Sequence, residues 1–428
     1  MKNSIVKLEC IDITVDFYGV CKYEGLVVFV KGLIPGEIAD VKITKVKNKI
    51  AYGIIDKLIK KSDYRIAEPC PVAYKCGSCD IQYIDYNYQL VLKQKLLKTT
   101  FKNMNVDAQI LDVLPSPNKY SYRNKIQVPV NDDKIGYYRT HSNDIVEFDK
   151  CFITNDSNGL ILSDIKELIR DYKITNYIRH IAIREASEGI MVCFVSNTLD
   201  IPNINDIVKT LISKHSSIKS ILLNLNTKDT NVIFGDLDKC LYGDEYIVDK
   251  CNDISYMIPL RSFYQINTLQ MKNLYDLVIS EGKLNNKDNV LDLFCGIGTI
   301  SLYIAKYVNT VLGVEIVDKS IEYANKNKEL NNIHNVSFIK GNANSINDYL
   351  KDYNTIIVDP PRKGLDQQLI NDICNSSINK VIYISCNQAT LARDIKLFSD
   401  SYKIGNVRPV DMFPQTKHIE SITVLTKK

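Results

Sequence analysis

The carboxyl-terminal part of the chain, residues 251–428, alternates short apolar runs with helical patterns. The apolar runs have the length of buried strands and lie at residues 289–294, 311–316, 355–358 and 380–385. The segments between them include patterns with helical spacing, such as 320–330 and 388–399. Because strands that alternate with helices form parallel sheets covered on both faces, we expect a doubly wound α/β sheet over this part.

The first of these strands runs into a glycine-rich turn that extends from Asp292 to Gly298. Glycines there let the backbone approach a ligand at the carboxyl end of the strand. The next strand ends in Glu315, an acid placed to bind ribose hydroxyls. Dehydrogenases share this arrangement, but they need a third glycine for a pyrophosphate. The turn resembles the first motif of class I methyltransferases, so we expect S-adenosylmethionine, with Asn342 near its adenine.

Two further strands end in side chains that could do chemistry at the same edge of the sheet. Asp359-Pro360-Pro361-Arg362 follows the first of them. Amino-methyltransferases have a related motif that ends in an aromatic residue, and Arg362 stands in that place; a plain turn is the alternative. The other strand delivers Cys386, which is either a packed small residue or a nucleophile.

Glu420 lies two residues after His418 and just before the last strand pattern, where a glutamate is usually a surface charge. Uracil C5 cannot displace the sulfonium methyl group unaided. Addition of a thiolate at C6 makes C5 enolate-like, and a base must remove the C5 proton after methyl transfer. Cys386 and Glu420, together with Asp359, therefore predict methylation of uracil at C5, with the cysteine as nucleophile and Glu420 as base.

Five motifs in the same order resemble those of bacterial RNA (uracil-C5) methyltransferases, particularly the ribosomal-RNA branch that carries an iron–sulfur cluster. They are Ser262-Phe263-Tyr264-Gln265-Ile266-Asn267, residues 292–298, Asp359-Pro360-Pro361-Arg362, Ser385-Cys386-Asn387 and His418-Ile419-Glu420. The resemblance implies cofactor contacts by Gln265, Phe294, Glu315 and Asp359, with Thr299 and Asn342 as weaker assignments. It also implies that Cys386 is the nucleophile and Glu420 the proton acceptor.

The chain departs from the family pattern at two positions. Gln388 stands where the family usually has a proline after Ser-Cys-Asn, and Asn342 stands where an acid is common. We expect these changes to alter loop stiffness without loss of the chemistry.

Four cysteines form a candidate metal site. Cys70, Cys76 and Cys79 are closely spaced, and Cys151 could complete a set of four. We expect a cytoplasmic protein, because the chain opens without a long apolar stretch, and thiols there are kept reduced. Four thiolates suit either zinc or a 4Fe-4S cluster, and their spacing does not decide between them. The family resemblance implies the cluster, as a structural element or as part of RNA recognition.

Positive charge gathers toward the amino terminus. Residues 1–130 hold 20 Lys and Arg against 13 Asp and Glu, an excess of seven in a chain whose net charge is +4. Because phosphate contacts supply most nonspecific nucleic-acid affinity, this basic end suits an RNA-facing role, although an ordinary solvated surface is the alternative.

We expect three parts in the chain. Residues 1–60 show short strand patterns and predict a small β-barrel, similar to a TRAM domain, that binds RNA. Residues 61–250 predict a central α+β domain with the four cysteines, whose helix over 80–110 could pack on the catalytic domain of residues 251–428. The family resemblance extends to Gly32–Glu37, Tyr122–Lys125 and Gly136–Arg139. These segments are basic and aromatic, as RNA contacts should be, although core packing is the alternative for each tyrosine taken singly.

The resemblance favours structured RNA as the substrate, specifically 23S ribosomal RNA, because the short tRNA enzymes similar to this family lack the four cysteines. Methylation of the T-loop uridine of tRNA is the nearest alternative. An inactive RNA-binding or assembly factor is another, against which Cys386, Glu420 and the glycine turn argue. A redox protein built on the cluster is the third. We expect a monomer without membrane association.

Overall fold

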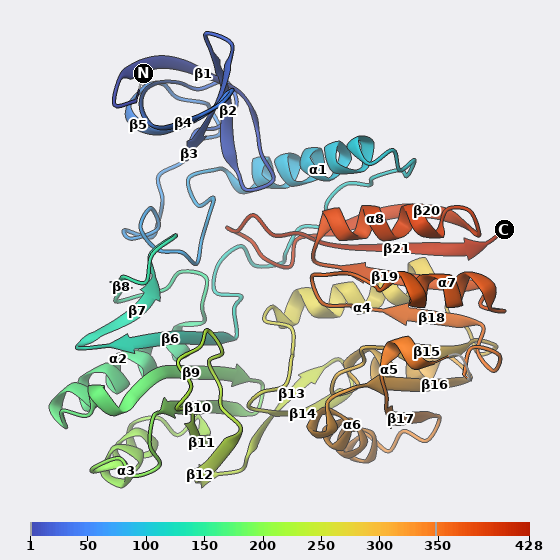
Figure 1. Cartoon of the computed structure of the whole chain (residues 1–428). Helices are drawn as coiled ribbons and strands as arrows, with labels where there is room; N and C mark the ends of the chain where they lie inside the picture. The colour runs from blue at the N-terminus through green and yellow to red at the C-terminus, as the bar shows by residue number, and fades with distance from the viewer. Residues whose placement is uncertain (1, 347–348) are drawn as a thin grey trace.

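The structure is a computed structural model that describes residues 2–346 and 349–428 (Figure 1). Its amino-terminal part is the expected small barrel, closed in the order β1-β2-β3-β5-β4. The strands are β1 (Ile5–Ile13), β2 (Tyr18–Tyr23), β3 (Leu26–Lys31), β4 (Ile38–Lys47) and β5 (Ile50–Lys60). Alternate side chains such as Leu8 and Cys10 fill the interior. Lys42, Lys45 and Lys47 of β4 are exposed on the outside.

The barrel is fixed to the rest of the molecule by a buried carboxylate. Glu37, on the turn before β4, accepts hydrogen bonds from Nε and Nη2 of Arg65 at 2.5 and 2.7 Å. It also accepts one from the backbone N–H of Ile34 at 3.0 Å. Because Glu37 is fully buried and Arg65 lies just beyond β5, this ion pair ties the base of the barrel to the following segment.

The central part is built on a sheet with the strand order β12-β11-β10-β9-β6-β7-β8. Its strands are β6 (Lys125–Asn131), β7 (Lys134–Tyr138), β8 (Ile145–Glu147), β9 (Ile178–Ala186), β10 (Gly189–Ser196), β11 (Ile218–Leu225) and β12 (Leu237–Gly243). Helices α2 (Asp156–Asp171) and α3 (Ile204–Lys214) pack on one face. Met191 and Cys193 on the other face join the core of the carboxyl-terminal part.

The carboxyl-terminal part, from residue 251 on, contains the expected doubly wound α/β sheet, in the order β17-β16-β15-β18-β19-β21-β20. The strands are β15 (Asn289–Leu293), β16 (Thr310–Glu315), β17 (Val336–Lys340), β18 (Thr355–Val358), β19 (Lys380–Ser385), β20 (Tyr402–Val410) and β21 (Glu420–Lys427). The strands from β17 to β19 are parallel, and β21 runs antiparallel to β19. The direction of winding changes between β15 and β18, which is where such sheets bind ligands.

Helices cover both faces of this sheet (Figure 1). They are α4 (Thr268–Gly282), α5 (Thr299–Ile304), α6 (Asp318–Leu330), α7 (Gln367–Asn375) and α8 (Gln388–Phe398). The helices α4, α5 and α6 share one core with Val290 and Ile382, and α7 and α8 share the other with Leu291 and Tyr383. A hairpin of β13 (Tyr246–Cys251) and β14 (Ile254–Pro259) precedes the sheet. The expected boundary at residue 250 lies in β13 and stays a prediction.

One long helix, α1 (Tyr86–Asn103), lies between the barrel and the carboxyl-terminal strands (Figure 1). Leu97 and Phe101 enter the core that α7 and α8 share, while Leu92 packs toward the barrel. Val91 of the same helix is exposed. Within the described ranges, no helix combines the length and the apolar character needed to cross a membrane.

Candidate active site

The carboxyl ends of three neighbouring strands bring the expected reactive residues together. Leu293 of β15 pairs with Val358 of β18, and Val358 pairs with Tyr383 of β19. The residues that follow these strands therefore emerge at one edge of the sheet. They include Asp359 directly after β18 and Cys386 directly after β19.

Glu420 reaches the same edge from the antiparallel strand β21. Ser385, the last residue of β19, pairs with Ser421 of β21. In an antiparallel pair the next position on one strand faces the preceding position on the other, so Cys386 lies opposite Glu420. Two residues far apart in the sequence thus meet through the register of two strands.

Burial dominates the electrostatics of this group. Glu420 is only 3% exposed, and its Oε1 atom has no hydrogen-bond partner among the described residues. Burial raises the pKa of Glu420 well above its ordinary value; the nearby charge of Asp359 raises it further, and Arg362 opposes the shift. Burial also raises the pKa of Asp359 to about 7. Asp359 is therefore able to hold or release a proton near neutral pH.

Cys386 is partly buried beside the two carboxyls. Burial, together with the charges of Glu420 and Asp359, raises the pKa of the thiol to about 11. Arg362 lowers the thiol pKa through its charge and a hydrogen bond. The resting cysteine is consequently a protonated thiol at neutral pH, and it needs help to become the thiolate that attacks carbon.

Arg362 is a functional candidate to which sequence reasoning gave no role. It faces Cys386, Glu420 and also His418, whose pKa is lowered to about 4 by burial, with the charge of Arg362 contributing. The signal was present in Asp359-Pro360-Pro361-Arg362, which served only to disfavour an aromatic base-stacking motif. A cation here opposes the desolvation of the neighbouring anions.

The Arg362 loop is fixed to the start of α8. The carbonyl oxygen of Arg362 accepts hydrogen bonds from Nδ2 of Asn387 at 3.1 Å and Oγ1 of Thr390 at 3.3 Å. Asn387 also caps α8, because its side-chain oxygen accepts from the backbone N–H groups of Ala389 and Thr390. Gln388 is thus the first residue of the helix, a position that favours proline but does not require it.

The glycine turn has the geometry of a ligand cradle. Gly296 and Gly298 have φ values of 56° and 81°, which other residues rarely adopt. A Cβ atom on Gly296 would meet open space, whereas one on Gly298 would lie 2.5 Å from the ring of Phe338. Phe294, between them and β15, also has a positive φ of 65°. The backbone at Gly296 is therefore open to a ligand.

Two carboxyls lie beside this turn. Glu315 accepts hydrogen bonds from the backbone N–H groups of Gly296, Ile316 and Val317 at 3.2, 2.9 and 3.0 Å. A carboxylate has further lone pairs, so it can still accept ribose hydroxyls. Asp292 is 1% exposed and accepts from Oγ of Ser301 at 2.5 Å. Burial raises the pKa of Asp292 to about 7.

The remaining expected cofactor residues differ in their surroundings. Gln265 is buried before α4, and its carbonyl oxygen accepts from Nδ2 of Asn124 at 3.0 Å. Thr299 begins α5, and its Oγ1 atom accepts from the hydroxyl of Tyr275 at 2.9 Å. Asn342 is exposed and caps a short turn, η3 (Ala343–Ser345). Their cofactor contacts stay a prediction.

The four cysteines of the candidate metal site line one cavity. Cys70, Cys76 and Cys79 come from one loop, and Cys151 lies before α2. Burial raises the pKa of the first three thiols, and Cys151 adds to each shift through its charge. In the described part of the chain, however, there is no group of three or more His, Cys, Asp or Glu side chains whose arrangement could hold a metal ion. The thiols converge without forming such a group.

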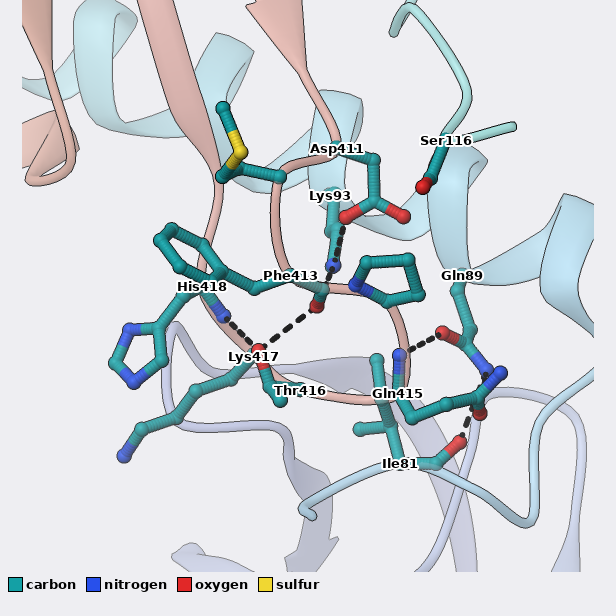
Figure 2. A network of polar contacts seen from close by, with 12 residues as sticks. Ile81, Gln89, Lys93, Ser116, Asp411, Phe413, Gln415, Thr416, Lys417 and His418 are labelled. Atoms are coloured by element: carbon teal, nitrogen blue, oxygen red, sulfur yellow. Dashed lines mark hydrogen bonds and ion pairs between the residues drawn. The ribbon is translucent and has the colours of Figure 1, made fainter. Parts of the chain in front are cut away.

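The loop between β20 and β21 carries His418 (Figure 2). It leads directly into Glu420, the first residue of β21. It is held from outside the sheet. Nζ of Lys93 on α1 lies 2.6 Å from Oδ1 of Asp411, and both side chains are fully buried. Sequence reasoning missed this pair, because a lysine in a helical pattern is ordinarily a surface residue.

The chain is similar to known proteins over most of its length. A family described as tRNA (Uracil-5-)-methyltransferase matches residues 85–428. The TRAM domain matches residues 18–55, which lie in the barrel.

Individual relatives cover the whole chain. A protein from Bacillus cereus, described as an uncharacterized RNA methyltransferase, is 40% identical over 99% of this chain and 97% of its own length. One from Clostridium acetobutylicum with the same description is 35% identical, over 96% of this chain and 94% of its own. A crystal structure of the Pyrococcus abyssi tRNA (uracil-54, C5)-methyltransferase with S-adenosyl-L-homocysteine is similar with a TM-score of 0.81. It is 28% identical, over 98% of this chain and 99% of that one.

Proposed function

Because the chain belongs to the RNA (uracil-5-)-methyltransferase family, whose reaction uses S-adenosylmethionine, we propose that it methylates C5 of a uridine in 23S ribosomal RNA through Cys386 and Glu420. The observation that carries the assignment of residues is the register of β19 and β21, which sets Cys386 opposite Glu420. Asp359 and Arg362 complete the group at this edge of the sheet.

The residues at the glycine turn fit the methyl donor. Gly296 leaves open space beside its backbone, and Glu315 has lone pairs left for ribose hydroxyls. We assign Phe294 and Gln265 to the same site, with Thr299 and Asn342 at its margin. S-adenosylmethionine supplies the methyl group from its sulfonium. No phosphate has to be accommodated, which agrees with a turn that has two glycines.

Cys386 opens the reaction by adding to C6 of the uracil. The thiol must first lose its proton, because burial and two carboxyls hold its pKa near 11. We assign this proton to Asp359, which faces the thiol and has a pKa raised to about 7. Arg362 favours the thiolate. The new S–C6 bond turns C5 into the carbon nucleophile that takes the methyl group.

Glu420 completes the reaction by removing the proton from C5. The electrons of the C5–H bond then form the C5–C6 double bond, and the S–C6 bond breaks to release the Cys386 thiolate. The Oε1 atom supports this assignment, because it is a buried acceptor to which no group in the described part of the chain donates and is free for substrate. A raised pKa makes the carboxylate a stronger base than an exposed glutamate once it is ionised.

We infer that the four-cysteine cavity holds a 4Fe-4S cluster. The four thiolates of such a cluster bind four different iron atoms, so they lie farther apart than the ligands of one zinc ion. The four thiols that line one cavity support this inference. The cluster would crosslink the loop of residues 70–79 to Cys151. Methyl transfer moves no electrons through it, so its role is structural or in RNA recognition.

The RNA-facing surface would be formed by the barrel and the central part. A base in folded RNA must leave its stack to reach Cys386, which costs a few kcal/mol that contacts to the RNA backbone offset. Exposed Lys42, Lys45 and Lys47 on β4 are placed for such contacts. Asp16 of the barrel also forms an ion pair with Lys417 at 2.6 Å, so the barrel borders the loop that carries His418.

Methylation of tRNA is a second candidate, because a similar crystal structure is that of a tRNA (uracil-54, C5)-methyltransferase. That likeness extends over nearly the full length of both chains, so the three-part architecture is compatible with either RNA. The four-cysteine cavity is what favours ribosomal RNA.

Mapping of 5-methyluridine tests the proposal and separates these candidates. We expect cells that lack the gene to lose the modified uridine from 23S ribosomal RNA and to keep it in the tRNA T-loop. Transfer of tritium from labelled S-adenosylmethionine to the unmodified RNA should depend on Cys386. Loss of the tRNA modification alone would favour the second candidate, and RNA binding without transfer would contradict catalysis.

A further inference from the structure

The nine-residue loop from Asp411 to Ile419 precedes the proposed base, and side chains outside the catalytic sheet determine its path (Figure 2). The Nζ atom of Lys93 contacts Oδ1 of Asp411 at 2.6 Å and donates to the carbonyl oxygen of Phe413 at 3.2 Å. The hydroxyl of Tyr86 donates to Oδ2 of Asp411 at 2.8 Å. Both carboxylate oxygens of Asp411 are therefore bound by α1.

A second contact between α1 and the loop is a pair of glutamine side chains. Nε2 of Gln89 donates to Oε1 of Gln415 at 2.9 Å, and the backbone N–H of Gln415 donates to Oε1 of Gln89 at 3.2 Å. Gln415 has a positive φ of 67°, which a glutamine rarely adopts without such restraint. Its carbonyl oxygen accepts from the N–H groups of Asp80 and Ile81.

We propose that Lys93 and Asp411 are positioning residues that hold Glu420 in place for removal of the C5 proton. The inference rests on the proposed function, since it concerns the same base. Neither residue touches the reacting atoms. Lys93 contacts both Asp411 and the carbonyl oxygen of Phe413, and the ring of Phe413 packs edge-on against His418 with their ring centroids 6.1 Å apart. His418 is two residues from Glu420.

The chemistry of the pair supports a role beyond stability. A fully buried ion pair is rarely more stabilising than apolar side chains of the same volume, because both charges lose their hydration. Its particular property is geometric, since a charge-assisted contact accepts only a narrow range of positions. Catalysis is sensitive to such placement, and a shift of about 1 Å can slow a step about 100-fold.

The test is the lifetime of the covalent intermediate between Cys386 and RNA. Misplacement of Glu420 slows only the step that follows methyl transfer, so methylated adduct accumulates. We expect K93M/D411N to raise the fraction of enzyme in adduct on denaturing gels about tenfold or more over the wild type. The double variant leaves no unpaired buried charge, so it is expected to fold even where K93M alone does not. Tyr86→Phe should give a smaller rise.

The matched control is the ion pair of Lys380 and Asp288, 3.5 Å apart and largely buried at the amino end of β19. K380M/D288N should change the melting temperature without changing the adduct fraction. If E420Q accumulates adduct while K93M/D411N shows the same fraction of enzyme in adduct as the wild type, the positioning role is wrong. If neither accumulates adduct while RNA is methylated, the roles proposed for Cys386 and Glu420 are wrong as well.

Discussion

Cys386 and Glu420 lie opposite each other at the end of the β19–β21 pair, one position beyond the last paired residues, Ser385 and Ser421. Burial raises the pKa of both groups, and the charge of Asp359 raises both further. The charge of Glu420 also raises the pKa of the Cys386 thiol. A nucleophile and a base that share a dry site cannot both be charged at little cost.

The reactivity of Cys386 toward iodoacetamide should be low at neutral pH and rise about tenfold per pH unit from 7 to 10, because its pKa is near 11 and only the thiolate reacts. Arg362→Met should slow the labelling, since Arg362 lowers the thiol pKa. Glu420→Gln should accelerate it, since the carboxylate raises that pKa. Peptide mass spectrometry after timed labelling measures all three rates. Equal rates in the two variants would contradict the coupling.

Asp292→Asn should raise stability above pH 7 and have little effect near pH 4. Burial raises the pKa of Asp292 to about 7 in the folded chain, from 3.8. The unfolded chain therefore loses this proton first, and the stability of the wild type falls as pH rises from about 4 to 7. The Asp292→Asn variant has no proton to lose, so its free energy of unfolding exceeds that of the wild type by an amount that grows with pH to at most about 4 kcal/mol. Melting temperatures at pH 5 and 8 measure it; an equal difference at both would contradict it.

Glu315→Gln should weaken the binding of S-adenosylhomocysteine about 10- to 100-fold. Hydrogen bonds to a charged group contribute about 1.5–3 kcal/mol, and the substitution also disturbs three backbone N–H contacts. Calorimetric titration measures the change. Glu322→Gln is the control, because Glu322 is exposed on α6 and should leave the affinity unchanged. Equal affinities in the two variants would place the cofactor elsewhere.

Protein purified without oxygen should contain about four iron and about four sulfide ions per chain and should absorb visible light. Cys76→Ser should lose the iron, since Cys76 lines the cavity with Cys70, Cys79 and Cys151. Cys240→Ser is the control, because Cys240 is exposed on β12 outside that cavity. Elemental analysis would contradict the cluster if it found one zinc ion per chain instead.

Much of the catalytic fold can be predicted from local pattern. The apolar runs and the glycine turn after Asp292 depend only on neighbouring residues, so periodicity and turn chemistry are sufficient. The barrel follows for the same reason. The antiparallel return of β21 beside β19 is different, because pairing between distant strands leaves no local signal. Chemical reasoning about uracil linked Cys386 to Glu420 where pattern could not.

The supporting residues were beyond sequence reasoning for a physical reason. Lysine is typical of exposed positions on helices, and only the tertiary fold removes Lys93 from water. Asp411 and Gln415 lie in a loop whose conformation depends on α1. Arg362 was visible in its motif, but its effect on the Cys386 thiol requires knowledge of which groups face it.

The most direct test of the account is the fate of the bond between Cys386 and RNA when the base is removed. Glu420→Gln, incubated with unmodified substrate RNA and S-adenosylmethionine, should accumulate a covalent complex that survives denaturing gels. Mass spectrometry should locate methylated uridine on the peptide that contains Cys386, and Cys386→Ala/Glu420→Gln should form no complex. Normal turnover by Glu420→Gln, or attachment of the RNA to a different residue, would contradict the proposed mechanism.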